Sequence, residues 1–170
     1  MEENFLTKSL KGSFYKLFKN PESALKVYRA MLDKYPHKVW LYPVIVKLHV
    51  KAKKDILELD LLTLKRALFL RPKDKTIVLA AADFYLKKNM ATPEAVKIYT
   101  AALEFDPDNI DLLNTLGRIY LQDTKNYYKG LDIYHKLISL GQTGLLDDEH
   151  LVRAFLRRNS EKLFGASSLV

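Results

Sequence analysis

The chain has 170 residues, no cysteine, and 28 basic against 20 acidic side chains, which makes its formal net charge +8. A hydrophobic share of 48% excludes a disordered chain, and the absence of cysteine excludes disulfides and thiolate metal sites. Residues 1–75 hold 17 basic and 8 acidic side chains, whereas residues 76–170 hold 11 and 12, so the positive charge lies in the first half. Such a field favours an acidic protein surface, a nucleic acid or an anionic membrane as partner.

The amino terminus reads Met1-Glu2-Glu3-Asn4, which is acidic where a secretory signal has basic residues followed by an apolar stretch. The longest uninterrupted apolar run is Ile77 to Ala82, much shorter than the about 20 residues that a membrane-spanning helix needs. The sequence as written therefore predicts a cytoplasmic protein without a membrane span.

Apolar residues recur with the 3.6-residue period of a helix along most of the chain, and no segment shows the alternation of a strand. We expect helices near residues 4–19, 21–34, 39–52, 56–70, 75–88, 93–105, 109–122, 126–139 and 147–163. Asn20 and Thr92 each precede Pro-Glu, a combination that favours a helix N-terminus, because the side chain caps and the proline needs no N–H there. Asp74 and Asp108 are the predicted N-caps of the helices that follow Pro72 and Pro107.

One segment recurs along the chain. Asn20-Pro21-Glu22-Ser23-Ala24-Leu25-Lys26-Val27-Tyr28 returns as Thr92-Pro93-Glu94-Ala95-Val96-Lys97-Ile98-Tyr99 and, more loosely, as Gly130-Leu131-Asp132-Ile133-Tyr134. In each copy a small residue precedes a tyrosine by four positions, so the two share one helical face. A second stripe begins six residues after each of Pro36, Pro72 and Pro107 and has the spacing of an amphipathic helix. Each unit thus carries two helices.

This pattern resembles the tetratricopeptide repeat (TPR) family. The best copy has the residues Leu113, Leu116, Gly117, Tyr120, Gly130, Tyr134 and Leu137 at the family's positions. The resemblance implies an all-α fold, a right-handed superhelix of about four stacked antiparallel helix pairs (a TPR-like α-solenoid) with a C-terminal capping helix. Asp60 departs from it, standing where a small residue is expected. The first helix, with Leu6, Leu10, Phe14 and Leu17, matches only loosely, and its register stays open.

The resemblance implies the following division of the chain. Residues 1–140 hold four TPR-like helix-pair repeats, at about 5–36, 37–72, 73–107 and 108–141. Residues 142–164 hold the C-terminal capping helix, with Asp147, Asp148 and Glu149 in its first turn and an apolar stripe of Leu151, Ala154 and Phe155. Residues 165–170 are a flexible tail.

Candidate catalytic and metal-ligating residues are few. No two of the four histidines, His37, His49, His135 and His150, are three or four positions apart. His49 stands where the other copies have Tyr85 and Tyr120, which indicates a hydrogen-bonded core residue. The run Asp147-Asp148-Glu149-His150 is typical of helix capping, because consecutive helical residues point in different directions. We therefore expect no catalytic residue, no metal site and no cofactor, and the sequence predicts that the protein is not an enzyme.

Recognition of a partner is the function that remains. In this family the first helix of each pair lines a concave groove, and the resemblance implies the partner-binding residues Trp40, Lys47, Lys51, Leu79, Asp83, Lys87, Asn114, Arg118 and Gln122, with Leu121 on the same face. Their mixture of cations and apolar groups favours a peptide or helix with acidic residues beside apolar anchors. The sequence thus predicts a non-enzymatic protein–protein interaction module or assembly scaffold. An ordinary solvated helix face is the competing interpretation.

The alternative function is a scaffold in RNA processing that resembles the related half-repeat family and uses the basic N-terminal half. A cluster of Lys47, Lys51, Lys53 and Lys54 would suit it. That family carries two aromatic residues three positions apart in the first helix of each pair, whereas Trp40 is followed at that distance by Pro43. Nucleic acid is therefore the less favoured partner.

Overall fold

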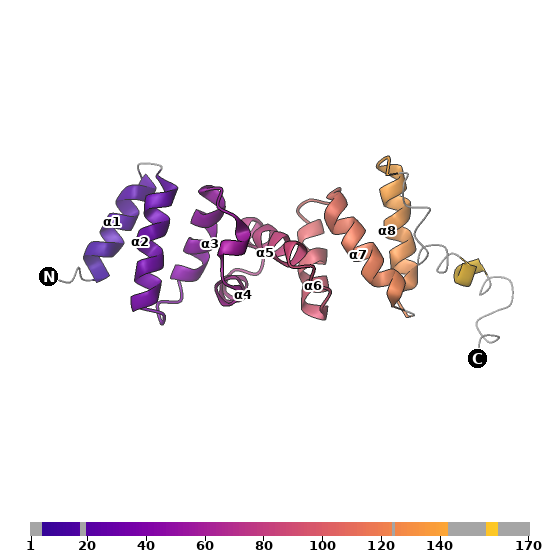
Figure 1. Ribbon diagram of the computed structural model, residues 1–170, viewed down its shortest axis with the longest axis horizontal. Helices are drawn as coiled ribbons and strands as arrows, with labels where there is room; N and C mark the ends of the chain where they lie inside the picture. The colour runs from indigo at the N-terminus through magenta and orange to yellow at the C-terminus, as the bar shows by residue number, and fades with distance from the viewer. Residues whose placement is uncertain (1–4, 18–19, 124, 143–155, 160–170) are drawn as a thin grey trace. The chain divides into compact units, whose positions relative to one another are not determined.

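The computed structural model describes residues 5–17, 20–123, 125–142 and 156–159, and within these ranges the chain is helical and contains no strand. The expected all-α class is confirmed for them. Figure 1 shows the elements in chain order: α1 (Phe5–Leu17), α2 (Pro21–Lys34), α3 (Leu41–Lys51), the 3₁₀ helix η1 (Ile56–Glu58), α4 (Leu61–Leu70), α5 (Lys75–Lys87), α6 (Pro93–Leu103), α7 (Ile110–Gln122) and α8 (Tyr127–Ser139). No helix in the described part is long and apolar enough to cross a bilayer.

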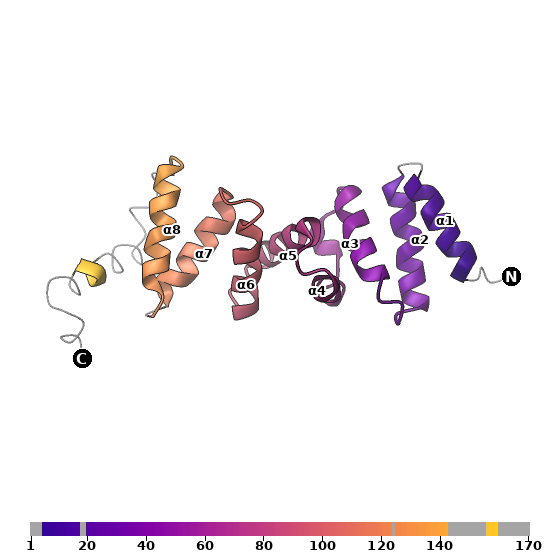
Figure 2. The same cartoon turned by 180° about the vertical axis from the view of Figure 1, so that it is seen from behind.

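The chain forms two compact units, Met1–Lys88 and Asn89–Val170. In the first, α1 packs on α2, α2 on α3, and α3 on both α4 and α5, and Figures 1 and 2 show α1, α2 and α3 side by side from opposite directions. In the second, α7 packs on α6 and on α8. The boundary falls between α5 and α6, the two helices of the predicted repeat 73–107. The division into four repeats stays a prediction.

Side-chain caps begin most of the helices. The Asn20 and Thr92 side chains accept hydrogen bonds from the backbone N–H groups three residues on, at 3.1 and 3.2 Å, and Asp74 caps α5 in the same way. The prediction for Asp108 is wrong. Asn109 caps α7 instead, accepting from the Leu112 N–H at 3.1 Å, whereas the Asp108 carboxylate pairs with the Lys136 ammonium at 3.0 Å. An N-cap must stand directly before the first turn, and Asp108 is one residue too early.

The predicted single helix over 56–70 is wrong, because the chain breaks it at Asp60. Residues Ile56–Glu58 form one 3₁₀ turn, and α4 begins only at Leu61. The Asp60 carboxylate caps α4 by accepting from the Thr63 N–H at 2.8 Å and the Thr63 hydroxyl at 2.6 Å. Asp60 therefore serves as a helix cap.

A glycine–tyrosine contact recurs in both units. A Cβ added at Gly117 in α7 would lie 2.8 Å from Cε2 of Tyr134 in α8, and one added at Gly12 in α1 would lie 2.9 Å from Cζ of Tyr28 in α2. Both glycines are therefore places where a helix approaches the ring of the next helix. Leu10, one of the apolar residues of the first helix, is 72% exposed and so does not belong to a packing face.

The second unit has a hydrophobic core between α7 and α8. Its buried members are Leu113, Leu121, Tyr127, Leu131, Tyr134 and Leu137. In α6, Tyr99 is fully buried and its hydroxyl donates to the Met90 carbonyl at 2.8 Å. Most of the predicted helix 147–163, and with it the acidic first turn and apolar stripe, lies outside the described residues. Residues 156–159 are helical, and the Arg157 guanidinium lies 5.6 Å from the centroid of the Tyr127 ring.

Candidate partner-binding site

The nine predicted partner-binding residues fall into two sets, one in each unit. Six of them lie at the start of α3, along α3 and along α5, and three lie along α7. All nine reach the surface: Leu79 and Asn114 are half-buried, and Trp40, Lys47, Lys51, Asp83, Lys87, Arg118 and Gln122 are exposed. Leu121 does not belong with them, because it is buried in the α7–α8 core, where a Cβ added at Gly130 would meet its side chain at 2.8 Å.

A recess in the first unit contains two of the predicted residues. It has a volume of about 540 Å³ and lies beside the N-terminal end of α3 and the connection between α4 and α5. We call it the Trp40 recess, and its lining residues are Val39, Trp40, Pro43, Val44, Lys47, Leu70, Arg71 and Asp74. Its walls combine apolar and charged side chains and are partly open to solvent, since Val39 is 53% exposed and Leu70 is 36% exposed.

Aromatic contacts hold Trp40 in place while leaving part of its ring accessible. The indole packs edge-to-face on Tyr28 of α2, with centroids 6.0 Å apart, and on Phe5 of α1, at 6.4 Å. It nevertheless remains 41% exposed. Because two helices support one edge of the ring, Trp40 presents a positioned apolar surface to the recess, which costs little side-chain entropy on binding.

The recess carries one ion pair and one cation at its margin. The Lys47 ammonium pairs with the Asp74 carboxylate, and this contact, with the hydrogen bonds from Lys47 and from backbone N–H groups, lowers the pKa of Asp74 although partial desolvation opposes it. The Arg71 guanidinium is exposed and forms no ion pair within the described part of the chain. Residues 71–75 hold three exposed cations, Arg71, Lys73 and Lys75, and one carboxylate, Asp74, so this segment carries a net positive charge.

The predicted cations differ in their surroundings. Lys87 pairs with the Asp55 carboxylate at 3.3 Å and with Asp83, one turn earlier in α5, at 3.5 Å. The hydrogen bond to Asp55 raises the pKa of Lys87. Lys51 and Arg118, in contrast, form no ion pair among the described residues. Two of the four predicted groove cations are therefore already compensated by neighbouring carboxylates.

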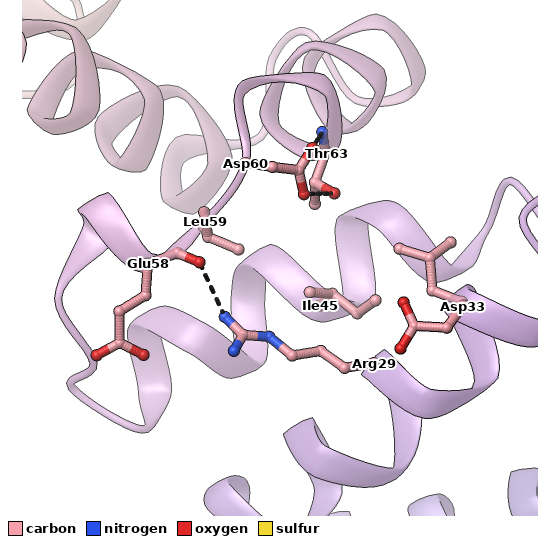
Figure 3. A pocket seen from close by; sticks show the side chains of 8 residues that line it. Arg29, Asp33, Ile45, Glu58, Leu59, Asp60 and Thr63 are labelled. Atoms are coloured by element: carbon pink, nitrogen blue, oxygen red, sulfur yellow. Dashed lines mark hydrogen bonds between the residues drawn. The ribbon is translucent and has the colours of Figure 1, made fainter.

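A second recess, of about 170 Å³, lies where α2, α3 and the start of α4 meet (Figure 3). The Arg29 side chain extends into it and donates to the Glu58 carbonyl at 3.5 Å. On its other side the Asp60 carboxylate binds Thr63 through both oxygens. The polar groups of this recess serve the fold, and we do not assign a partner to it.

His49 is the buried polar residue at the centre of the first unit. Its Nε2 lies 2.7 Å from the Asp55 carbonyl and its Nδ1 lies 3.0 Å from the Arg29 guanidinium. A carbonyl can only accept and a guanidinium can only donate, so Nε2 carries the proton and the ring is neutral. The predicted hydrogen-bonded core histidine is confirmed. Burial lowers the pKa of His49 and the nearby Arg29 charge acts in the same direction, although the bond to Asp55 opposes both.

The neutral His49 ring predicts a pH-dependent stability. Below the ordinary histidine pKa of about 6.5 the unfolded chain takes up a proton that the folded chain refuses. The free energy of unfolding should therefore fall as the pH drops from about 7 towards the lowered pKa, by at most about 1.4 kcal/mol per pH unit. Urea denaturation between pH 7.5 and 5 measures this slope. His49→Gln keeps a donor and an acceptor but does not titrate, so its curve should be flatter, and parallel curves would contradict a neutral ring.

Sequence reasoning missed most of the recess lining. Val39, Val44, Leu70, Arg71 and Asp74 were not among the predicted residues, and the last three are far from Trp40 along the chain. A partial signal existed in the close spacing of Arg71, Lys73 and Lys75 between two helices. No group of three or more His, Cys, Asp or Glu side chains suited to a metal ion occurs in the described residues.

Part of this chain is similar in sequence to a known member of a protein complex. No protein-family model matches it. The chain is 40% identical over 81 residues to the BBSome complex member BBS4 of Bos taurus. The aligned segment is 47% of this chain and 14% of that protein, so the chain spans a small part of its relative.

Proposed function

We propose that this chain is a non-enzymatic interaction module of the TPR type, which binds an acidic segment of a partner protein on the α3 and α5 side of its first unit. The observation that carries the proposal is the Trp40 recess, an apolar depression with a supported aromatic ring and a cationic margin. Apolar anchors that fill a pocket and charges that surround it are the two components of a protein interface.

Two further observations support the proposal. The first unit holds 19 basic and 9 acidic side chains, whereas the second holds 9 and 11, so an acidic partner is attracted to the first unit. The partial homology to a subunit of a multi-protein complex is also consistent with an assembly role. The exposed Arg118 and Gln122 of α7, with Asn114, form the corresponding face of the second unit.

Charge reversal on α3 tests the proposed surface. A partner purified from the source cells with the native chain should bind at least tenfold more weakly to the double variant Lys47→Glu, Lys51→Glu, because acidic groups on both sides then repel. Isothermal titration calorimetry measures the affinity. Loss of the Lys47–Asp74 pair should lower the stability by about 1 kcal/mol, and Lys51→Glu, at an exposed site, should change it by less than about 0.5 kcal/mol. The matched control reverses Lys26 and Lys97, which are exposed on α2 and α6, and should leave the affinity within twofold.

The RNA-binding alternative predicts a different result. The basic first unit favours it, and binding to single-stranded RNA would weaken steeply with salt, with a log–log slope of about −0.7 for each phosphate neutralised. Lys53 and Lys54, which are exposed beyond the end of α3, should then matter as much as Lys47. Tight, sequence-tolerant RNA binding at physiological salt that survives the α3 reversal would contradict the protein-binding proposal.

A further inference from the structure

The Lys47–Asp74 ion pair occupies the place where an acidic partner would meet the Trp40 recess. Both residues line the recess, and the Asp74 carboxylate reaches the Lys47 ammonium across it from the N-terminus of α5. The Asp74 side chain also caps α5, accepting from the Ile77 N–H at 3.4 Å. This cap holds a negative charge at the margin of a recess that is otherwise apolar and cationic.

We propose that the Trp40 recess takes one apolar side chain of an acidic segment, and that Asp74 is an internal competitor whose carboxylate the segment's own carboxylate displaces from Lys47. The inference rests on the proposed function. It further specifies the kind of side chain that the recess binds and the residue that limits the affinity. The exposed Arg71 guanidinium, on the same margin, is available for a second carboxylate.

The size and lining of the recess suit this occupant. A volume of about 540 Å³ lies within the range of about 300–1,000 Å³ that ligand pockets have. Val39, Trp40 and Leu70 expose apolar surface that a Leu or Phe side chain would cover. A basic segment would instead meet Lys47 and Arg71 in the lining, and like charges brought together at an interface are repulsive.

The Lys47–Asp74 pair is weak enough to be exchanged. The Lys47 side chain is 49% exposed and that of Asp74 is 20% exposed, so solvent screens their attraction. Exposed pairs contribute about 0–1 kcal/mol. A segment that brings its own carboxylate can therefore replace Asp74 on Lys47, whereas a neutral segment gains no such contact and must leave the pair intact. Lys47 thus selects for acidic segments, and Asp74 lowers the affinity for them.

The single tryptophan of the chain provides a direct measurement of occupancy. Trp40 is the only tryptophan, and it lies in the recess, so one indole N–H signal in a ¹⁵N–¹H spectrum reports binding there. The probe is a nine-residue Gly/Ser peptide with a central Leu and two Glu on each side. Matched peptides replace the four Glu by Gln or by Lys, or the Leu by Ser. We expect the acidic Leu peptide to shift the Trp40 signal and to bind most tightly.

Substitution of Asp74 is the decisive variant. Asp74→Asn removes the charge and keeps a residue that caps well, so α5 should still form. The affinity for the acidic Leu peptide should rise about threefold to fivefold, as expected for loss of a competing exposed ion pair. Asp33→Asn is the matched control, since it makes the same charge change on the exposed surface of α2 and should leave the affinity unchanged. Lys47→Gln should weaken binding and reduce the effect of Asp74→Asn.

The outcomes separate this inference from the proposed function. Equal effects of Asp74→Asn and Asp33→Asn would overturn the competitor role, and tighter binding of the Lys or Ser peptide would overturn the assigned occupant. If the fluorescence anisotropy of a fluorescein-labelled acidic peptide rises on binding while the Trp40 signal does not shift, the peptide binds elsewhere. The assignment to the Trp40 recess is then wrong, although the protein still binds acidic segments. A Trp40 signal that moves with protein concentration alone would assign the recess to a second copy. If a purified partner binds the double variant Lys47→Glu, Lys51→Glu as tightly as the native chain, the proposed function itself is wrong.

Discussion

Replacing Tyr134 by Ala should lower the free energy of unfolding of the second unit by about 4 kcal/mol, the largest effect that we expect from a single substitution. Tyr134 is 1% exposed and lies in the α7–α8 core with Leu113, Leu131 and Leu137. Truncating a buried aromatic side chain removes its transfer free energy and leaves a cavity, which together cost about 3–5 kcal/mol. The ring also packs against Gly117, so its loss would leave the cavity between α7 and α8.

Native-state hydrogen exchange of α7 and α8 amides measures this effect, because it reports the second unit separately from the first. Asp132→Ala is the matched control on the exposed side of α8 and should cost less than about 0.5 kcal/mol. Similar losses in the two variants would mean that the packing face of α8 is assigned wrongly.

Gly117→Leu should destabilise the second unit by about 2 kcal/mol. The first atom of the new side chain would already lie 2.8 Å from the Tyr134 ring and 3.1 Å from Cγ2 of Ile133, closer than van der Waals contact permits. Overpacking of this kind costs about 1–3 kcal/mol and pushes the helices apart. Leucine favours the helix over glycine by less than about 1 kcal/mol, so the clash should outweigh the gain in helix propensity.

The control is Arg118→Leu, which puts the same side chain on the exposed neighbour of Gly117 and should change the stability by less than about 0.5 kcal/mol. The double variant Gly117→Leu, Tyr134→Ala completes a cycle, since the new side chain can occupy the space that the ring leaves. The double variant should lose less unfolding free energy than the sum of the two single variants, by at least about 1 kcal/mol. Additive losses would show that residues 117 and 134 do not share this contact.

Local signals in the sequence predicted the helices well. Most predicted helices lie within two residues of the observed bounds, because caps such as Asn20, Thr92 and Asp74 act on N–H groups only three residues away. The two local errors have the same origin. Asp60 and Asn109 are also caps, and each displaced the expected start of a helix because the helical period does not show which of several polar residues begins the first turn.

Contacts between helices were predictable only where the repeat pattern supplied them. Gly117 is one of the residues that match the repeat pattern, and it meets Tyr134, but Gly12 was not recognised as its counterpart in α1. Leu6, Leu10, Phe14 and Leu17 suggested another face, and Leu10 proved to be exposed. Helical spacing shows which residues share a face, whereas the neighbouring helix decides which face is buried.

The sequence by itself determined the helical class, most helix bounds, the buried histidine and the presence of Trp40 and Lys47 on one surface of α3. These properties follow from interactions over three or four residues and from a repeated pattern. Only the tertiary structure placed Leu70, Arg71 and Asp74 beside Trp40, and only it showed that Asp74 neutralises Lys47 and that Asp55 binds Lys87. The packing of α3 on α4 and α5 brings together side chains about 30 residues apart, and no local spacing in the chain encodes that proximity.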